Sequence, residues 1–343
     1  MSRANQKLRV CVVGLGMGYA HAKAYSAMEN VDLYVCDLDE TKVKRAQSEL
    51  NVKGVLGSWE EALDSKLVDA LDTALPHDLH KQVALKAAEA GKHFMTEKPI
   101  ARTLEEADAM IAAAKKAGIK FMVSENQRFE PAVIKTKEFV ESGLLGEIFL
   151  VTVFEIWFGR FGGWRLDKQR QGGGNLIDSG IHAVNTFRTI CGSEVESVYS
   201  LSNRFGFTEL GGEDTNLLAI KLKSGAIGNM MTSWNVAHSG PLTRFAVYGN
   251  DGCAWQEFGG DWGLYFQSSK LPQGLSYHEQ PTKVLVEKIN TIEAACRHFV
   301  DCILNDKQPI MSGEEGRKDL EIVLAAYRSA ETGLPVSLPL SKK

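Results

Sequence analysis

The first 125 residues alternate short apolar runs with amphipathic segments, and this rhythm constrains the fold more than any other feature of the chain. The apolar runs predict strands at 8–13, 31–36, 68–74, 93–96 and 119–123. Helices are predicted between them at 19–28, 41–49, 79–90 and 103–118, with a shorter one behind the capping box Ser58–Glu61. Strands that alternate with helices are joined by right-handed crossovers and run parallel. We therefore predict an α/β domain with a doubly wound parallel sheet over residues 1–125.

Residues 126–343 have a different rhythm, in which consecutive strand-like segments are joined by glycine-rich and polar turns. Strands are predicted at 147–158, 195–204, 215–223, 226–236, 243–248 and 254–258. Helices are predicted at 131–143, 175–191 and 289–304, followed by one that begins at Ser312 and ends at Gly333. Runs of strands favour a mostly antiparallel sheet that carries helices on one face. The 343 residues are thus predicted to form two domains, 1–125 and an α+β domain over 126–343.

Composition narrows the classes of function. The formal net charge is −4 and the chain has no long basic run, which argues against nucleic-acid binding. The six cysteines are scattered without a C-x-x-C pair, so we expect neither disulfides nor a metal site. The polar segment Met1–Lys7 leads directly into a strand, and no stretch approaches the roughly 18 apolar residues of a membrane span. We expect a cytoplasmic protein that binds neither membranes nor nucleic acid.

A glycine-rich turn follows the first predicted strand. Gly14 permits a tight turn, and Gly16 lets the backbone approach a pyrophosphate at the start of the next helix, where free N–H groups favour an anion. The third glycine of the G-x-G-x-x-G pattern would fall at position 19, which is Tyr19. Either Gly18 takes its place in a slightly different loop, or the helix packs less closely on the strand.

The second predicted strand ends at Asp37, where an acidic side chain can accept hydrogen bonds from the adenosine ribose hydroxyls. The same carboxylate would repel a 2′-phosphate, and positions 38 and 40 are Leu and Glu rather than Arg. The pattern therefore predicts a Rossmann domain that binds NAD in preference to NADP. The alternative is that Asp37 only begins the turn before the next helix.

Two further segments carry groups suited to proton chemistry. Lys98 follows directly on the strand 93–96, and ligands of open α/β sheets bind outside the carboxyl ends of the strands. Asp178 and His182 are four residues apart in a predicted helix, hence on one face, behind the turn Gly172–Gly174. Most lysines and lone histidines are surface or packing residues, and it is the combination that favours a chemical site.

These motifs together resemble the glucose–fructose oxidoreductase, inositol dehydrogenase and rhizopine-catabolism (Gfo/Idh/MocA) family over nearly the whole chain. The resemblance rests on the glycine loop, Thr73–His80, Ala90–His93, Glu97-Lys98-Pro99, Asn126–Phe129, and the Gly172–Gly174 segment with Asp178 and His182. Glu-Lys-Pro followed by Asp-x-x-x-His is far more specific than a glycine loop. This sequence departs from the family at Tyr19 and at Asn185, where many relatives carry an acidic residue.

The resemblance implies a sugar or cyclitol dehydrogenase in which Lys98, Asp178 and His182 are catalytic. It also implies an open-faced C-terminal sheet used for contacts in a homodimer or homotetramer. On this basis we expect the cofactor to be bound by Gly14, Gly16, Met17, Gly18, Asp37, Leu38, Ala74, Pro76, His80, Glu97, Lys98 and Asn126.

The substrate pocket is expected in the second domain. Indole faces stack on the apolar faces of sugar rings, and Arg can clamp a carboxylate. Trp157, Trp164 and Arg165 lie close to the Gly172–Gly174 turn and are the expected pocket residues, although strand tryptophans equally fill a domain core. Arg128 is expected to bind substrate at the crevice between the domains, together with Lys98, Asp178 and His182.

Oxidation of a secondary alcohol needs a base for the hydroxyl proton while hydride leaves for the nicotinamide. Neutral His182 suits that role near neutral pH. Lys98 would hydrogen-bond the reacting oxygen, and Asp178 would orient the imidazole or bind a neighbouring hydroxyl. Two rival functions are a redox-assisted lyase or glycoside hydrolase with tightly bound NAD, and a non-enzymatic sugar sensor.

Overall fold

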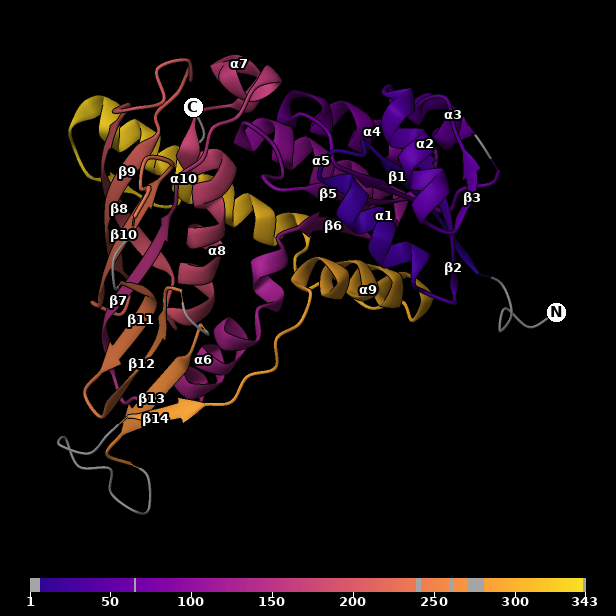
Figure 1. Ribbon diagram of the computed structural model, residues 1–343. Coiled ribbons are helices and arrows are strands. Elements are labelled where there is room, and N and C mark those ends of the chain that lie inside the picture. Colours follow the sequence, from indigo (N-terminus) through magenta and orange to yellow (C-terminus); the bar gives the residue numbers. More distant parts are fainter. Residues whose placement is uncertain (1–6, 65, 239–241, 260–261, 271–280, 342–343) are drawn as a thin grey trace. The chain divides into compact units, whose positions relative to one another are not determined.

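A computed structural model describes residues 7–64, 66–238, 242–259, 262–270 and 281–341 (Figure 1). The chain forms two compact units, one of residues 1–126 with 290–317 and the other of residues 127–289 with 318–343. A single boundary after residue 125 therefore does not describe the division, because a helical segment near the C-terminus completes the first unit. Of the helices described, none has the length and apolar character needed to cross a lipid bilayer.

The first unit is a six-stranded parallel sheet in the order β3-β2-β1-β4-β5-β6. Its strands are β1 (Leu8–Val13), β2 (Val31–Cys36), β3 (Val52–Val55), β4 (Ala70–Thr73), β5 (His93–Glu97) and β6 (Phe121–Ser124). Its helices are α1 (Gly18–Ser26), α2 (Glu40–Glu49), α3 (Trp59–Asp64), α4 (His80–Glu89), α5 (Leu104–Ala117) and α9 (Thr291–Leu304). The predicted doubly wound sheet is confirmed.

Local signals place the ends of these helices. Thr103 accepts the N–H of Glu106 at the start of α5, and Gly118 ends this helix with φ of 65°. Gly91, after α4, has φ of 66°. Such left-handed residues end helices by satisfying the last carbonyl groups, and glycine adopts them without strain. In Figure 1, α1 and α9 lie together on one face of the sheet, and α4 and α5 lie together on the other.

The second unit is a nine-stranded sheet in the order β14-β13-β12-β11-β7-β10-β9-β8-β15. Its strands are β7 (Ile148–Ile156), β8 (Val195–Asn203), β9 (Thr215–Leu222), β10 (Ile227–Ser233), β11 (Thr243–Gly249), β12 (Gly252–Glu257), β13 (Leu264–Ser268), β14 (Thr282–Val284) and β15 (Val336–Ser337). Its helices are α6 (Pro131–Glu141), α7 (Lys168–Gln171), α8 (Ile181–Ile190) and most of α10 (Gly313–Thr332).

This sheet is mostly antiparallel, with one exception that the sequence did not predict. Strands β7 and β10 run parallel, with Leu150 opposite Ile227. A parallel pair needs a long connection, which α7, α8, β8 and β9 supply here. Helices α6 and α8 contact β12 and β7 and cover one face (Figure 1). Val151, Val153 and Met230 are buried on that side.

The helix predicted at 175–191 is interrupted. Residues Leu176–Gly180 form a π-helical turn, and α8 begins at Ile181. Such turns are rare and occur often at functional sites. Asp178 and His182 therefore do not share one regular α-helix. Asp178 lies in the wider turn and His182 in the first turn of α8.

Candidate active site

The glycine loop between β1 and α1 has the form that a dinucleotide phosphate requires. Gly14 has φ of 87°, and a Cβ there would lie 2.5 Å from the carbonyl oxygen of Ala74. A Cβ on Gly16 would meet nothing within 4 Å, so the backbone there faces open space. A Cβ on Gly18 would lie 3.1 Å from both Val12 Cγ1 and Ala74 Cβ. Gly18 thus provides the close helix–strand contact of the third glycine, which decides between the two alternatives left by the sequence.

The start of α1 is suited to an anion. Met17 precedes the helix and makes no side-chain capping bond, and the first turn holds no acidic residue. Backbone N–H groups and the helix dipole favour negative charge at such a position. The strand order reverses between β1 and β4, and the loop lies at this switch point, where open α/β sheets bind ligands. The residues present fit a dinucleotide.

Asp37 lies beside this loop at the end of β2. Its Oδ2 accepts the N–H of Leu15 at 2.5 Å, and its Oδ1 accepts the N–H of Asp39 at 2.8 Å. The carboxylate is therefore both next to the glycine loop and at the beginning of the turn into α2, so the two interpretations of Asp37 are compatible. The neighbouring Leu38 is 94% exposed, and its contact with a cofactor stays a prediction.

His80, expected among the cofactor contacts, occupies a supporting position. Its side chain is fully buried, with Nδ1 2.9 Å from the carbonyl oxygen of Pro99 and Nε2 3.0 Å from that of Leu75. Burial lowers the pKa of the imidazole. His80 joins the segment after β4, which holds Ala74 and Pro76, to the segment after β5. A direct contact of this side chain with the cofactor stays a prediction.

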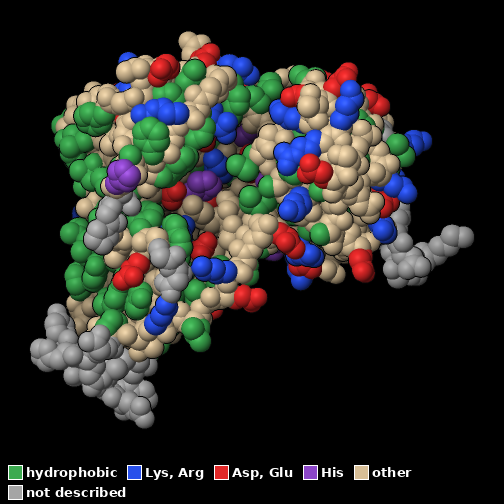
Figure 2. Space-filling view, viewed as in Figure 1, with side chains coloured by type: hydrophobic (Ala, Val, Ile, Leu, Met, Phe, Trp, Pro, Cys, Tyr) green, Lys and Arg blue, Asp and Glu red, His purple; other side chains and the backbone are tan. Residues whose placement is uncertain are grey.

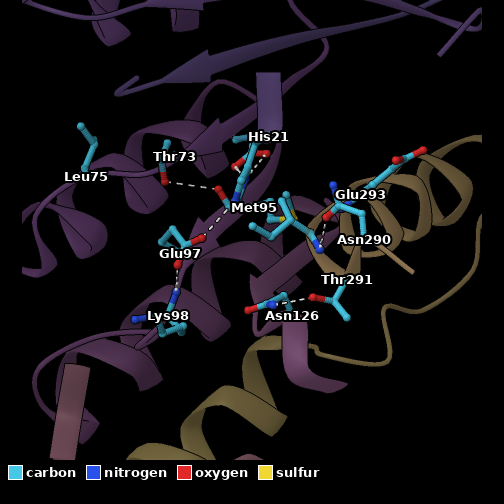
Figure 3. A network of polar contacts seen from close by, with 12 residues as sticks. His21, Thr73, Leu75, Met95, Glu97, Lys98, Asn126, Asn290, Thr291 and Glu293 are labelled. Carbon is cyan, nitrogen blue, oxygen red and sulfur yellow. Dashed lines mark hydrogen bonds and ion pairs between the residues drawn. The ribbon is translucent and has the colours of Figure 1, made fainter. Parts of the chain in front are cut away.

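Lys98 directly follows β5 and is half-buried (Figure 3). Its N–H donates to Glu97 Oε2 at 3.2 Å. The other Glu97 oxygen lies 3.0 Å from His21 Nε2, and His21 Nδ1 lies 2.9 Å from Asp72. Asn126, at the end of this unit's first segment, donates to Thr291 Oγ1 of α9 at 2.7 Å. His21 and Asp72 were not predicted as site residues, although an acidic residue inside the apolar strand run was a signal.

In the second unit, Asp178 is buried and held by two donors. Its Oδ2 accepts Arg165 Nε at 2.9 Å and Gln171 Nε2 at 3.1 Å. The Arg165 guanidinium also lies 4.6 Å from the ring centroid of Trp164. Three of the predicted substrate residues, Trp164, Arg165 and Asp178, are thus brought together. His182 is half-buried one turn further on.

A second group of residues, which the sequence did not predict, holds the π-helical turn. Tyr327 of α10 accepts the N–H groups of Gly174 and Ile177 at 3.2 and 3.1 Å and donates to Glu213 at 3.0 Å. Glu213 accepts the N–H of Leu176 at 2.8 Å, and burial raises the pKa of its carboxyl. These contacts fix the wider turn that carries Asp178. The contacts of Tyr327 join residues 114 to 153 positions apart, which no local pattern could indicate.

The tryptophans divide between core and surface. Trp234 is fully buried and donates its Nε1–H to Ser179 Oγ at 2.9 Å. Trp157 is 37% exposed and meets Phe161 edge-on at a centroid distance of 5.7 Å. Trp157 can therefore contact a ligand, whereas Trp234 is a core residue.

Two other residues named from the sequence have partners inside the second unit. Arg128 Nη1 donates to Thr189 Oγ1 of α8 at 2.5 Å, so its role in substrate binding stays a prediction. Asn185 donates to the buried carboxylate of Asp319 at 2.8 Å, and Arg188 pairs with the same carboxylate. An acidic residue at position 185 would place a second negative charge beside Asp319, so the amide suits this site.

Comparison with known proteins identifies close relatives. Residues 8–125 match the family described as "Oxidoreductase family, NAD-binding Rossmann fold", and residues 133–255 match the "GFO/IDH/MocA C-terminal domain". The chain is 30% identical to levoglucosan dehydrogenase of Pseudarthrobacter phenanthrenivorans over 284 residues, which cover 72% of this chain and 73% of that protein. It is 29% identical to scyllo-inositol 2-dehydrogenase (NAD(+)) of Bacillus subtilis, with 98% of each chain covered. A solved structure of levoglucosan dehydrogenase with NADH and levoglucosan has the same fold, with a TM-score of 0.88 at 24% identity over 98% of this chain and 100% of that one.

Proposed function

Because the chain belongs to the GFO/IDH/MocA family of oxidoreductases, we propose that it is an NAD-dependent dehydrogenase of a secondary hydroxyl in a sugar, sugar acid or cyclic polyol. One observation carries the proposal. Lys98 directly follows β5, at the carboxyl edge of the parallel sheet. The glycine loop lies at the same edge, at the switch point between β1 and β4. An ammonium group on that edge suits a substrate oxygen beside a dinucleotide, since ligands of such sheets bind there.

NAD, when bound, supplies the acceptor for the hydride. The Lys98 ammonium donates a hydrogen bond to the reacting oxygen and stabilises its developing negative charge. An imidazole nitrogen of His182 takes the hydroxyl proton. Asp178, fixed by Arg165 and Gln171, orients the imidazole or accepts a hydrogen bond from a neighbouring hydroxyl. The roles of Lys98, Asp178 and His182 require the two units to bring these residues to one substrate, and that is part of the proposal.

A spectrophotometric screen with NAD and NADP against inositols, aldoses and uronates tests this function. We expect net formation of NADH with at least one of these substrates. Product formed without net NADH would point to transient oxidation, as in a redox-assisted lyase or hydrolase. A protein that binds NADH but turns over no member of the screen would contradict the proposal.

Preference for NAD over NADP is proposed to rest on Asp37. In Asp37→Ser the carboxylate that accepts ribose hydroxyls and repels a 2′-phosphate is lost. We expect the ratio of kcat/KM for NAD to that for NADP to fall by about 10- to 100-fold, equivalent to about 1.4 to 2.8 kcal/mol. Asp39→Ser is the matched control. Asp39 caps α2 by accepting the N–H of Thr41, a role that serine can keep. An unchanged ratio in Asp37→Ser would show that another group selects the cofactor.

We also propose that the uncovered face of the second unit's sheet binds a second copy of the chain. Leu201, Leu217 and Ile227 are 56%, 44% and 58% exposed on β8, β9 and β10. Leu201 and Leu217 are direct neighbours across the strands. Figure 2 shows hydrophobic side chains along the margin of this unit where Figure 1 places these strands. Exposed apolar side chains grouped on one face of a sheet are a common feature of interaction surfaces.

Leu217→Glu is expected to shift the protein from dimers or tetramers toward monomers, because a carboxylate would be buried without a partner at the contact. Size-exclusion chromatography with light scattering measures the mass. Leu67→Glu, at a 51% exposed leucine of the first unit, is the control and should leave the mass unchanged. A monomeric wild-type protein would remove the basis for this contact.

A further inference from the structure

A buried ionic cluster lies inside the first unit, next to Lys98 (Figure 3). His21 comes from the first turns of α1, Asp72 from β4 and Glu97 from the end of β5. The side chains of His21 and Asp72 are fully buried, and that of Glu97 is 14% exposed. His21 Nδ1 lies 2.9 Å from Asp72 Oδ2, and its Nε2 lies 3.0 Å from Glu97 Oε1.

The hydrogen-bonding geometry favours a charged imidazole. Both ring nitrogens of His21 face carboxylate oxygens, and only the imidazolium form has two N–H donors. Burial alone would lower the pKa of His21, but Asp72 and Glu97 outweigh it and raise that pKa to about 10. A buried positive charge of this kind is retained only where opposite charges and hydrogen bonds compensate its loss of water.

Two further titratable side chains of the first unit, Cys296 and Tyr25, lie near this cluster. The Sγ of Cys296, on α9, lies within 4.8 Å of a ring nitrogen of His21 and of a carboxylate oxygen of Asp72. Burial raises the pKa of the Cys296 thiol and of the Tyr25 hydroxyl on α1 well above their ordinary values. Although a histidine, a carboxylate and a thiol could together ligate a metal, both His21 nitrogens are already used by carboxylates. The cluster is therefore better described as one cation shared by two anions.

This cluster connects the two parts of the proposed site that the first unit carries. His21 stands three residues after Gly18, so it is rigidly tied to the glycine loop through α1. Glu97 accepts His21 Nε2 with one oxygen and the Lys98 N–H with the other, at 3.2 Å. Asp72, on the adjacent strand β4, holds the far side of the ring. The His21 imidazolium is thus connected to the glycine loop through α1. It is connected to the backbone of Lys98 through the Glu97 carboxylate.

We propose that His21 is a positioning residue, whose imidazolium fixes Glu97 and thereby sets Lys98 relative to the glycine loop. The inference rests on the proposed dehydrogenase function for Lys98. His21 touches neither substrate nor cofactor in this scheme. It acts by fixing the backbone position of Lys98, from which the ammonium reaches the substrate oxygen. A misplacement of about 1 Å at a reacting group can cost on the order of 10²-fold in rate.

His21→Gln tests this role, because glutamine is of similar size but is uncharged and donates from one nitrogen only. We expect kcat to fall by about 10- to 100-fold, while KM and the dissociation constant of NADH stay within about threefold. The control is His93→Gln. His93 begins the same strand β5, at its opposite end, and its Nδ1 accepts the N–H of Lys120 at 3.0 Å. This variant should lose stability without losing kcat. Equal effects of the two variants on kcat would overturn the proposal.

A double variant separates action through Glu97 from a general loss of stability. If His21 works through Glu97, His21→Gln combined with Glu97→Gln should lower kcat no further than Glu97→Gln alone. If the losses of kcat in His21→Gln and Glu97→Gln multiply in the double variant, the positioning role is contradicted.

A second measurement does not depend on activity, and its first arm uses only the wild-type protein. In wild-type protein labelled with ¹⁵N-histidine, nuclear magnetic resonance should show one imidazole with both nitrogens protonated at pH 8, and Glu97→Gln should remove this signal at the same pH. Detection of only neutral histidine tautomers at pH 8 would overturn the proposal. A wild-type protein that shows the imidazolium but oxidises no substrate would instead refute the dehydrogenase function.

Discussion

Replacing Lys98 by Ala is expected to lower kcat by about 10² to 10⁴, the usual range for loss of a group that stabilises charge or moves a proton in the transition state. The change removes the ammonium group. It keeps the backbone N–H that donates to Glu97, so the segment after β5 should stay in place. The dissociation constant of NADH should therefore change by no more than a few-fold. Steady-state kinetics and a fluorescence titration with NADH measure the two quantities.

Lys92→Ala is the matched control for this loss. Lys92 precedes the same strand at its other end, where its Nζ donates to the carbonyl oxygen of Val68 at 2.6 Å. Its removal should affect stability but leave kcat within about twofold, since it lies at the amino end of the strand and ligands bind at the carboxyl end. Normal turnover by Lys98→Ala would refute the assignment of this lysine.

His182→Ala should lower kcat to a similar extent, and the pair tests whether the two units serve one reaction. Groups that act on the same reacting atoms have strongly non-additive effects. If Lys98 and His182 both contact one substrate hydroxyl, the double variant should be only slightly slower than the worse single variant. If the two losses of kcat multiply in the double variant, Lys98 and His182 act in separate steps.

The first unit could be predicted from the sequence in most of its elements. Strands β1 and β2 coincide with the predicted runs because both are buried on their two faces, and such strands are continuously apolar. Strand β3 was missed. It contains a lysine and a glycine in four residues and alternates between half-buried and exposed side chains at the edge of the sheet. Strands β14 and β15 were missed for a related reason, since three and two residues are too few to show a period.

Only those parts of the candidate site that follow from local spacing in the sequence could be predicted. The glycine loop and Lys98 each follow a strand, so the topology alone places them at one edge of the sheet. His21 meets partners 51 and 76 residues away, and Tyr327 meets Glu213 at a separation of 114. Contacts of this kind depend on how whole elements are arranged. From the sequence, candidate ligand contacts could be proposed, but not the residues that hold these candidates in place.

The second large effect, on the free energy of unfolding, is expected at Trp234 in the aromatic core next to the π-helical turn. Trp234→Ala is expected to reduce the free energy of unfolding of the second unit by about 3 to 5 kcal/mol, as for other large-to-small changes at fully buried aromatic positions. Trp234 has no exposed surface and packs with Phe207 and Leu210, and its ring centroid lies 4.9 Å from that of Phe161. Denaturant unfolding followed by circular dichroism measures the loss.

Trp234→Phe separates packing from hydrogen bonding at the same position. Phenylalanine keeps most of the ring contacts but cannot donate to Ser179, which adjoins Asp178 in the π-helical turn. We expect this variant to lose only about 1 to 3 kcal/mol, the cost of leaving a buried hydroxyl without its donor. The kcat of this variant should nevertheless fall, because the turn that carries Asp178 is less firmly held. Both kcat and the free energy of unfolding should be lower still in Trp234→Ala. If Trp234→Phe matched the wild type in stability and turnover, the bond from the indole to Ser179 would have no part in fixing the turn, and the turn would be held by Glu213 and Tyr327.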